Sequence, residues 1–284
     1  MSSPELPEFS QVEDPAFIAS PTPPDPRRVL LDVDNVTLRF GGVVALNEVN
    51  FKLYEGEILG LIGPNGAGKT TCFNVMTGVY QPTSGAVRFH GEPLGRRKKF
   101  EITKLGIART FQNIRLFANM TALENVMVGA DARHRTGVGS AMFRLPRHRQ
   151  EEAEGRERAQ ELLDFMGLGK KADELARNLP YGDQRRLEIA RALATGPKLL
   201  CLDEPAAGFN PAEKRTLMDL IRKIRDQGYT VLLIEHDMKL VMGVTDRIVV
   251  LEFGRKIAEG LPAEIQDNPA VIAAYLGVDE EDAS

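Results

Sequence analysis

A glycine-rich segment followed by lysine and two threonines is the part of this chain best suited to chemistry. It reads Gly63-Pro64-Asn65-Gly66-Ala67-Gly68-Lys69-Thr70-Thr71, after the apolar run 58–62 and at the start of the helix-forming stretch 70–76. Glycines let backbone N–H groups turn towards phosphate oxygens, and the helix N-terminus adds a partial positive charge. Lys69 can reach the β- and γ-phosphates, and the Thr70 hydroxyl can ligate Mg²⁺. This order of strand, loop and helix predicts a site for ATP or GTP, rather than a glycine-rich turn with a chance lysine.

Two apolar runs further along the chain end in polar residues. Residues 199–202 lead into Asp203-Glu204, and residues 230–234 lead into Glu235-His236-Asp237. The carboxyl ends of the strands in an open α/β sheet form its ligand-binding edge. We therefore expect Asp203 to hold Mg²⁺ through its water shell, Glu204 to orient or polarise the attacking water, and His236 to contact the γ-phosphate. The alternatives are strand-end salt bridges for the acids and a satisfied surface or core position for the histidine.

Two more segments have side chains or backbone groups suited to a phosphate site. Gln112 follows Thr110-Phe111 and could ligate Mg²⁺ or the water, or merely cap a turn. The loop 179–183 opens a helix that runs to about residue 193, and a helix N-terminus attracts anions. One glycine-rich loop does not need a second such device. This helix start is therefore expected to serve a nucleotide held by another subunit.

The hydrophobic pattern indicates which elements position these residues. Apolar residues alternate along 31–40, 49–53 and 87–89, which predicts a small antiparallel β layer. The apolar runs 58–62, 199–202, 230–234 and 247–251 alternate with helical patterns, so a mainly parallel sheet covered by helices is expected. Helical spacing dominates from about 119 to 180.

The chain divides into three parts. Residues 1–28 hold seven of the seventeen prolines and are expected to be a disordered tail. An ATP-binding domain is expected at 29–260, with a helical subdomain inserted at about 113–183. The remainder, 261–284, has an acidic end and a short helix that starts at Asn268-Pro269 and uses Val271, Ile272 and Tyr275 for contact. The acid-free, Arg-rich stretch 133–149 could face membrane subunits or anionic lipid, or be a solvated loop.

Composition excludes several classes of protein. With 284 residues the chain can bury a full core, and its net charge of −4 argues against broad nucleic-acid binding. The two cysteines, Cys72 and Cys201, lie in apolar elements and are expected to be core residues in a reducing compartment. There is no secretory signal pattern, and no apolar stretch approaches the length of about 18 residues that spans a bilayer. The chain is therefore expected to be cytosolic and to reach a membrane only through a partner.

The order of these motifs resembles the ATP-binding subunits of ABC transporters over roughly residues 30–277. Within that superfamily, the chain is similar to the branched-chain amino acid importer subunits. The segments that carry the likeness are Arg39-Phe40-Gly41-Gly42, Arg109-Thr110-Phe111-Gln112, Tyr181-Gly182 with 184–190, 204–208, 235–238 and Ala273-Ala274-Tyr275-Leu276-Gly277. The resemblance implies an α/β P-loop NTPase of the ABC ATPase type, with a mixed sheet core, a small antiparallel β layer and an inserted α-helical subdomain.

The resemblance also implies roles for single residues. Phe40 would stack on adenine, with an ordinary strand-end core aromatic as the alternative, and Gly63 to Thr71 would bind the phosphates. Gln112 would couple the Mg²⁺ site to a membrane subunit. Glu204 would be the catalytic carboxylate, and His236 would contact the γ-phosphate.

The loop 179–183 would be the signature that faces a nucleotide held by the partner subunit. The general signature reads Leu-Ser-Gly-Gly-Gln, whereas here Pro180 replaces the serine, Tyr181 the first glycine and Asp183 the glutamine, with Gly182 retained. In addition, Asn210 stands where the loop after the acidic strand usually ends in aspartate. Proline has neither a hydroxyl nor an N–H to offer a phosphate. These departures predict two unequal ATP sites. The alternative is an equivalent signature formed by Gly182, Asp183 and the helix N-terminus.

The implied function is that of an ATP-binding and ATP-hydrolysing subunit, with Mg²⁺, that powers a membrane importer for branched-chain (hydrophobic) amino acids. It would lie peripherally at the cytoplasmic face of the plasma (inner) membrane. The expected partners are integral membrane permease subunits, a second, related ATP-binding subunit in a heterodimer, and a periplasmic or extracellular substrate-binding protein reached through the permease. The alternatives are another ABC transporter, for urea or a lipid-linked substrate, and a soluble ABC-type clamp on nucleic acid or the ribosome. Nucleic acid is not an expected partner, because the long coiled coil or second nucleotide domain usual in such clamps is absent from the sequence.

Overall fold

The structure is a computed structural model that describes residues 28–131 and 146–279. Most of the expected tail 1–28, residues 133–145 of the Arg-rich stretch and the acidic end 280–284 lie outside the described residues. The strands are β1 Val29–Phe40, β2 Val43–Tyr54, β3 Ile58–Ile62, β4 Ser84–Phe89, β5 Glu92–Pro93, β6 Ile107–Arg109, β7 Leu199–Asp203, β8 Thr230–Ile234, β9 Arg247–Glu252 and β10 Arg255–Gly260. The helices are α1 Lys69–Met76, α2 Lys99–Leu105, α3 Ala122–Asp131, α5 Pro146–Phe165, α6 Tyr181–Ala194, α7 Pro211–Asp226, α8 Met238–Val244, α9 Pro262–Gln266 and α10 Pro269–Asp279.

The first four-stranded sheet is the predicted antiparallel layer. Its order is β2-β1-β4-β5, and Leu31 pairs with Leu53 on one side and Phe89 on the other. Leu31 and Leu53 are fully buried and share a hydrophobic cluster with Phe73 of α1. The alternating apolar residues thus bury one face of this layer against the helix that follows the glycine-rich loop, which confirms the prediction.

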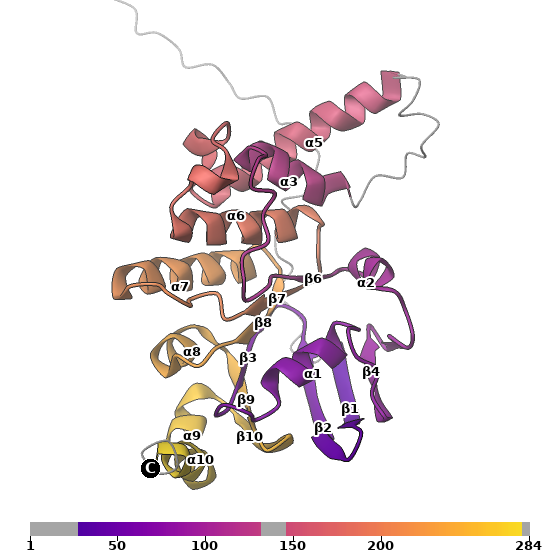
Figure 1. Ribbon diagram of the computed structural model, residues 1–284, viewed down its shortest axis with the longest axis vertical. Helices are drawn as coiled ribbons and strands as arrows, with labels where there is room; N and C mark the ends of the chain where they lie inside the picture. The colour runs from indigo at the N-terminus through magenta and orange to yellow at the C-terminus, as the bar shows by residue number, and fades with distance from the viewer. Residues whose placement is uncertain (1–27, 132–145, 280–284) are drawn as a thin grey trace, which may run out of the picture.

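A six-stranded sheet forms the centre of the molecule, in the order β10-β9-β3-β8-β7-β6. Its neighbours are parallel except for the β9–β10 pair. Every residue of β3, β7 and β8 is buried, because helices or strands cover both faces. Figure 1 shows α7 and α8 on one side of this sheet, and α1 with the antiparallel layer on the other. The mixed α/β architecture is therefore confirmed.

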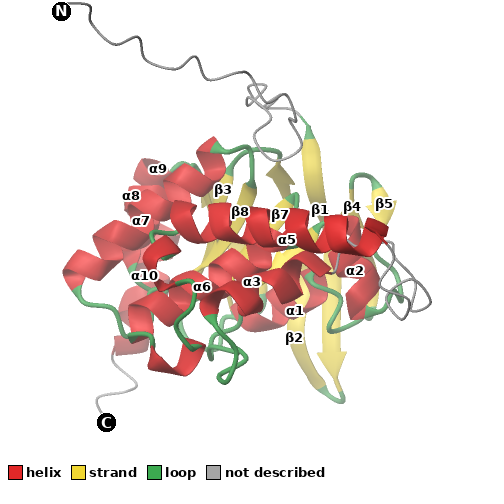
Figure 2. Ribbon diagram, turned by 90° about the horizontal axis from the view of Figure 1, so that it is seen from above, coloured by secondary structure: helices red, strands yellow, loops and turns green. Residues whose placement is uncertain are grey.

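Three helices form a layer at one end of the long axis. Figure 1 places α3, α5 and α6 together there, and in Figure 2, viewed from that end, they lie in front of the strands. The helix α5 begins at Pro146, and proline is favourable at the first helical position. Short 3₁₀ turns at Gly169–Lys171 and Ala176–Asn178 connect this layer to α6. None of the helices in the described ranges is both long and apolar enough to cross a bilayer.

The helix α7 has the N-cap that its sequence requires. Asn210 Oδ1 accepts the N–H groups of Ala212 and Glu213 at 2.9 and 3.0 Å. Asparagine caps a helix about as well as aspartate does. The departure at Asn210 therefore leaves the start of α7 intact. One face of the helix is apolar and buried, and it consists of Leu217, Leu220, Ile221 and Ile224.

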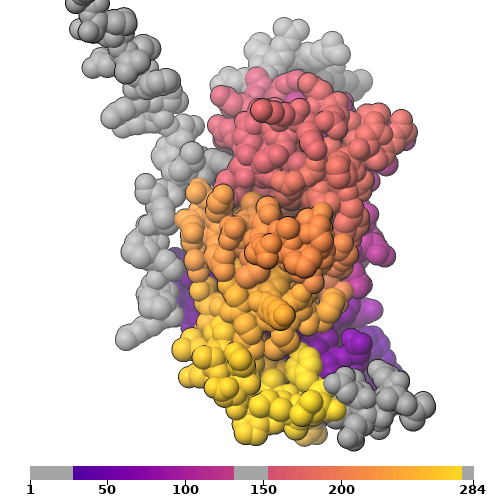
Figure 3. All heavy atoms as spheres, turned by 90° about the vertical axis from the view of Figure 1, so that its left-hand side faces the viewer, coloured from indigo at the N-terminus to yellow at the C-terminus, as the bar shows by residue number. Residues whose placement is uncertain are grey.

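The C-terminal helices cover the sheet at the opposite end from α3, α5 and α6. Figure 3 shows the left-hand side of Figure 1, where residues from the second half of the chain predominate and the C-terminal helices, in yellow, lie at the bottom. Asn268 Oδ1 accepts the Ala270 N–H at 2.9 Å, as predicted for an N-cap. The predicted contact face of α10 is partly wrong, since Ile272 is 44 % exposed while Val271 and Ala274 are buried. The helix is apolar nearly all round, so its sequence did not indicate which side would pack.

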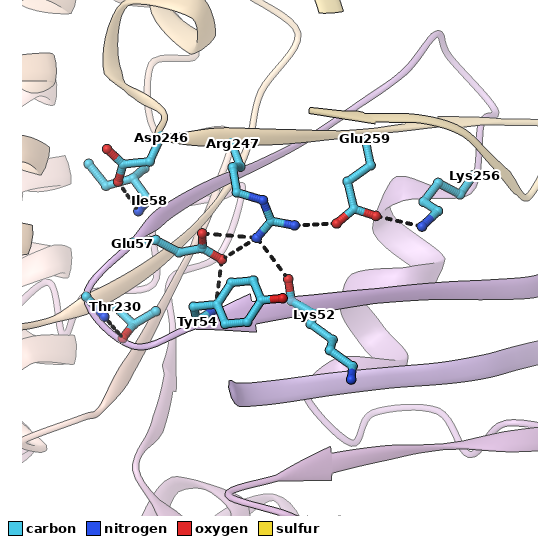
Figure 4. A network of polar contacts seen from close by, with 10 residues as sticks. Lys52, Tyr54, Glu57, Ile58, Thr230, Asp246, Arg247, Lys256 and Glu259 are labelled. Atoms are coloured by element: carbon cyan, nitrogen blue, oxygen red, sulfur yellow. Dashed lines mark hydrogen bonds and ion pairs between the residues drawn. The ribbon is translucent and has the colours of Figure 1, made fainter. Parts of the chain in front are cut away.

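One arginine joins the two sheets below the glycine-rich loop. Arg247 Nη1 donates to both carboxylate oxygens of Glu57, at 3.0 and 3.1 Å, and to the Lys52 carbonyl at 3.3 Å (Figure 4). Its Nη2 contacts Glu259, and its guanidinium stacks 5.0 Å from the Tyr54 ring. Glu57 immediately precedes β3, the strand that leads into the glycine-rich loop. The network therefore connects the start of β3 to β2 of the antiparallel layer and to β9 and β10 of the central sheet.

Candidate functional site

The glycine-rich loop, residues 63–68, connects β3 to α1 and requires glycine at several points. Gly63, Gly66 and Gly68 have φ angles of 149°, 78° and 95°. A Cβ at Gly63 would lie 2.1 Å from the Leu251 carbonyl oxygen, so the close approach of β9 also demands glycine there. These glycines explain why the loop can turn its backbone where bulkier residues would be strained or would clash.

Lys69 and its neighbours lie on and under this loop. Lys69 is 8 % exposed, and its Nζ donates to the carbonyls of Gly63 at 2.6 Å and Pro64 at 2.8 Å. Burial lowers the pKa of Lys69, and the negative charge of Glu204 opposes that shift. Of the other predicted phosphate residues, Pro64 and Ala67 are buried, Gly68 and Thr71 are intermediate, and Asn65, Gly66 and Thr70 are exposed. The loop therefore offers an exposed outer surface above a buried cation.

Asp203 ends β7 in a buried position. It is 6 % exposed, and its Oδ2 lies 3.0 Å from Nη2 of Arg109. Burial raises the pKa of Asp203, and Arg109 opposes this. Arg109 also donates to Asn74 Oδ1 at 2.6 Å, and its guanidinium lies 4.3 Å from the Phe73 ring. Arg109 thus links the acidic strand end to α1, a role that sequence reasoning missed although the residue was noted as part of a motif.

Two of the predicted site residues, Gln112 and His236, approach a third, Glu204. Gln112 Nε2 donates to Glu204 Oε2 at 2.9 Å, and His236 Nδ1 lies 3.8 Å from Oε1. Glu204 has a φ of 45°, a left-handed conformation that is strained for a side chain of this size, and its N–H is held by the Ile234 carbonyl at 2.9 Å. Strain of this kind is concentrated at functional sites, which is consistent with a carboxylate held in a fixed position.

Glu235 and Tyr275 were also missed as functional candidates. Glu235 is 1 % exposed, and its two oxygens accept N–H groups from Ala206 at 2.8 Å and His236 at 3.2 Å, so it ties together the loops that follow β7 and β8. Burial raises the pKa of Glu235. The Tyr275 hydroxyl is buried without a hydrogen bond of normal geometry, and the Gly63 backbone N–H opposes the rise that burial causes in its pKa. The sequence signals were a place in a quoted motif for both residues and, for Tyr275, a predicted contact position on the C-terminal helix.

Phe40 lies at the end of β1 and is 47 % exposed. Its ring contacts that of Tyr80 edge-to-face, with the centroids 5.2 Å apart. The alternative of an ordinary core aromatic is therefore wrong, because half of the side chain faces solvent. A partly exposed ring that is held by a second ring can stack on a planar ligand.

The signature residues lie away from α1, the helix that begins with Lys69. They start α6, which Figure 1 shows well separated from α1 along the long axis. The Tyr181 ring is 47 % exposed and lies edge-to-face with Phe209 at 6.1 Å. Asp183 is instead buried, with Lys171 Nζ at 2.5 Å and the Arg186 guanidinium on its two oxygens. Among the predicted signature residues, Tyr181 is therefore half-exposed, whereas Asp183 directs its carboxylate into the protein.

Comparison with known proteins supports the motif-based resemblance. The family model described as "ABC transporter" matches residues 46–207, and that described as "Branched-chain amino acid ATP-binding cassette transporter" matches residues 255–281. The chain is 49 % identical over 249 residues to the high-affinity branched-chain amino acid transport ATP-binding protein LivG of Escherichia coli, covering 87 % of this chain and 98 % of LivG. It is also 49 % identical over 251 residues to BraF of Pseudomonas aeruginosa, a protein of the same description, covering 88 % and 98 %.

Solved structures agree with these matches. The ADP conformation of an ATP-binding cassette of an ABC transporter superposes with a TM-score of 0.77 at 32 % identity, covering 88 % of this chain and 99 % of that chain. A nucleotide-free cassette gives a TM-score of 0.75 at 31 % identity, covering 87 % and 98 %. The predicted resemblance and fold class are both confirmed, and the chain therefore belongs to the ABC transporter ATP-binding cassette family.

Proposed function

We propose that this chain is the ATP-hydrolysing subunit of a membrane importer, and that branched-chain amino acids are the cargo. The observation that carries the ATPase part is the convergence of Gln112 and His236 on Glu204, whose charge also reaches the loop lysine Lys69. The cargo is inferred from the described function of the LivG and BraF relatives and from the matching C-terminal segment.

The proposed mechanism assigns one task to each group. The backbone N–H groups of residues 63–68 and the Lys69 ammonium bind the phosphates of ATP, and Phe40 stacks on its adenine. Glu204 accepts a hydrogen bond from the attacking water and orients it towards the γ-phosphate. Gln112 holds one Glu204 oxygen by a hydrogen bond, and His236, which lies 3.8 Å from the other oxygen, contacts the γ-phosphate.

The side chains assigned to Mg²⁺ fit that ion chemically. The Thr70 hydroxyl, the Gln112 amide oxygen and the Asp203 carboxylate are hard oxygen donors, and Mg²⁺ is usually bound by few protein ligands together with waters and substrate phosphates. Within the described ranges, no group of three or more His, Cys, Asp or Glu side chains could hold a metal by itself. Bound there, the ion would neutralise phosphate charge.

A groove beside the Gln112 loop is the proposed docking site for the permease. It encloses about 580 Å³, and its lining includes Arg109, Arg115, Phe117, Val128, Glu188 and Arg191. Phe117 is 48 % exposed and Val128 37 %, so the groove presents apolar surface between cationic side chains. A segment of the membrane subunit seated here would touch the loop that contacts Glu204. The site could then transmit the state of the nucleotide to the membrane.

The transport assignment predicts where the chain is found and what stimulates it. When it is co-expressed with its cognate membrane subunits, we expect the protein in the membrane fraction, peripherally at the cytoplasmic face. We also expect ATP turnover of the reconstituted complex to rise severalfold with a loaded periplasmic or extracellular binding protein and leucine, isoleucine or valine. Urea and a lipid-linked substrate serve as cargo controls. Stimulation by DNA or RNA, with none from the membrane subunits, would instead favour the nucleic-acid clamp.

The signature departures lead us to propose a heterodimer with a second, related ATP-binding subunit. Each ATP would lie between one subunit's glycine-rich loop and the other's signature. Pro180 cannot donate a hydrogen bond, and Asp183 is occupied by Lys171 and Arg186. Each lost charge-assisted hydrogen bond weakens closure on that side by about 1–3 kcal/mol. The site that uses this chain's own Lys69 and Glu204 should therefore carry most of the hydrolysis.

Single inactivation of each catalytic glutamate in the assembled transporter measures this asymmetry. We expect Glu204→Gln in this chain to remove most ATP turnover and the equivalent change in the partner subunit to remove much less. Phosphate release is measured at saturating ATP, and light scattering checks that each variant transporter is fully assembled. Equal losses from both single variants contradict the asymmetry and leave the ATPase assignment intact.

A further inference from the structure

Arg185 is a cation with no access to solvent that none of the assigned roles explains. It lies in the first turns of α6, is 0 % exposed, and is among the largest fully buried side chains of the described residues. Burying an isolated cation is very costly, so its partners must compensate. Those partners come from two segments that the proposed mechanism places at two different nucleotides.

Its guanidinium spans the gap between α6 and the Gln112 loop. Nη1 donates to the Phe111 carbonyl at 2.7 Å and to Glu188 Oε2 at 3.0 Å. Nη2 donates to the Gln112 carbonyl at 2.7 Å and to the Tyr181 hydroxyl at 3.3 Å. Two acceptors therefore belong to the loop and two to α6, while Nε has no hydrogen-bond partner.

The buried carboxylate completes the connection. Glu188 is 1 % exposed and compensates the charge of Arg185, and its Oε1 accepts the Arg115 N–H at 3.2 Å. The Gln112 loop is thus held at three backbone positions, Phe111, Gln112 and Arg115, by two side chains of one helix. A shift of α6 relative to this loop would break several charge-assisted hydrogen bonds at once.

Both ends of this clamp lie next to the chemistry. On the loop side, Arg185 binds the Gln112 carbonyl, and the Gln112 side-chain amide donates a hydrogen bond to Glu204 at 2.9 Å. On the helix side, the Tyr181 ring is 47 % exposed and is braced by Phe209. An arginine suits this position because its rigid fork fixes several acceptors at once, whereas lysine is a point charge on a flexible stem.

Building on the proposed ATPase function, we propose that Arg185 is a positioning residue that couples the two nucleotide sites. When Tyr181 closes on a nucleotide held by the partner subunit, the guanidinium moves the Gln112 backbone with α6. The side chain of Gln112 then sets the position of Glu204 at this chain's own site. Occupation of one site is thereby communicated to hydrolysis at the other.

The test uses the assembled transporter and removes the clamp without leaving a buried charge. In the double variant Arg185→Met/Glu188→Leu, both ions are replaced by apolar side chains of similar size, which buried ion pairs often tolerate. We expect the kcat for ATP to fall about tenfold and the Hill coefficient for ATP to fall to about one. The melting temperature without nucleotide, and the ATP affinity of the isolated subunit, should stay near those of the unmodified protein. Arg215→Met, at an exposed arginine of α7, is the matched control and should change neither kcat nor cooperativity.

A double-mutant cycle separates coupling from a general structural role. If Arg185 acts through Gln112, the double change should matter little once Gln112 is gone. Adding Arg185→Met/Glu188→Leu to Gln112→Ala should lower turnover less than about twofold below that of Gln112→Ala alone. The proposal is overturned if the two changes lower ATP turnover independently, so that their effects multiply. It is also overturned if Arg185→Met/Glu188→Leu leaves the cooperativity for ATP unchanged.

Two conservative variants cover the case in which the double variant does not fold. Arg185→Lys keeps the charge and should fail to restore cooperativity, and Tyr181→Phe removes one hydrogen bond at a half-exposed residue and should lower kcat about threefold. Full cooperativity in both variants overturns the proposal. The ATPase function itself has a separate control. If the proposed function is wrong, the unmodified complex will hydrolyse ATP no faster than its Glu204→Gln variant.

Discussion

Replacing Glu204 by glutamine is expected to reduce ATP turnover of the assembled transporter by about 100-fold or more, with little change in ATP affinity. The amide keeps the shape of the side chain but cannot accept a proton from water or polarise it as a carboxylate does. Binding should persist because Lys69 and the residues 63–68 are untouched. Removing the negative charge that faces the γ-phosphate should also stabilise the closed, ATP-bound pair of subunits.

Three measurements test this prediction. They are phosphate release, equilibrium binding of a fluorescent ATP analogue, and light scattering of the two ATP-binding subunits with and without ATP. Glu161→Gln removes a carboxylate from an exposed position on α5 and should leave all three unchanged. Near-normal hydrolysis by the Glu204→Gln transporter would show that another group orients the water.

Replacing Lys69 by alanine is expected to abolish phosphate-directed binding and turnover together. Its ammonium is the buried cation of the loop, with hydrogen bonds to the Gly63 and Pro64 carbonyls at 2.6 and 2.8 Å. A substrate phosphate would replace those neutral carbonyl acceptors with anionic oxygens, which bind an ammonium more strongly. Losing two such bonds should weaken ATP binding by about 100-fold. The effect should be much smaller for adenosine, which has no phosphate to bind.

Comparing ATP with adenosine makes this result specific to phosphate. Lys223→Ala removes an exposed lysine of α7 and is the matched control, for which both affinities should stay unchanged. Thermal unfolding without nucleotide checks that the loop still folds. If Lys69→Ala retained ATP affinity within about threefold, Lys69 would not be the phosphate ligand of this site.

Much of the fold could be predicted because its signals are local. The buried runs of β3, β7 and β8 lack the polar alternation of half-exposed strands, and this pattern alone indicates a sheet covered on both faces. The start of α7 follows from Asn210 and Pro211, since a cap depends on the residues next to it in the chain. The glycines of the loop 63–68 likewise reflect conformations that each residue must adopt by itself.

Side-chain directions within predicted elements were less certain. Ile272 was expected to pack and is exposed, because a short helix that is apolar nearly all round has no unique inner face. Asp183 was expected to face a partner's nucleotide, and its carboxylate is buried between Lys171 and Arg186. Both outcomes depend on neighbours that are distant in the chain or specific to the packing.

The sequence by itself determined the family, the two sheets and the polar residues that end the strands of the central sheet, because these depend on residue type, hydrophobic period and local order. Only the tertiary structure decided which of those polar groups act together. Gln112 meets Glu204 across 92 positions, Arg109 meets Asp203 across 94, and Arg185 meets the Gln112 carbonyl across 73. The direction and distance of such contacts are set by how strands and helices pack in space. No local sequence pattern specifies which oxygen a buried cation contacts.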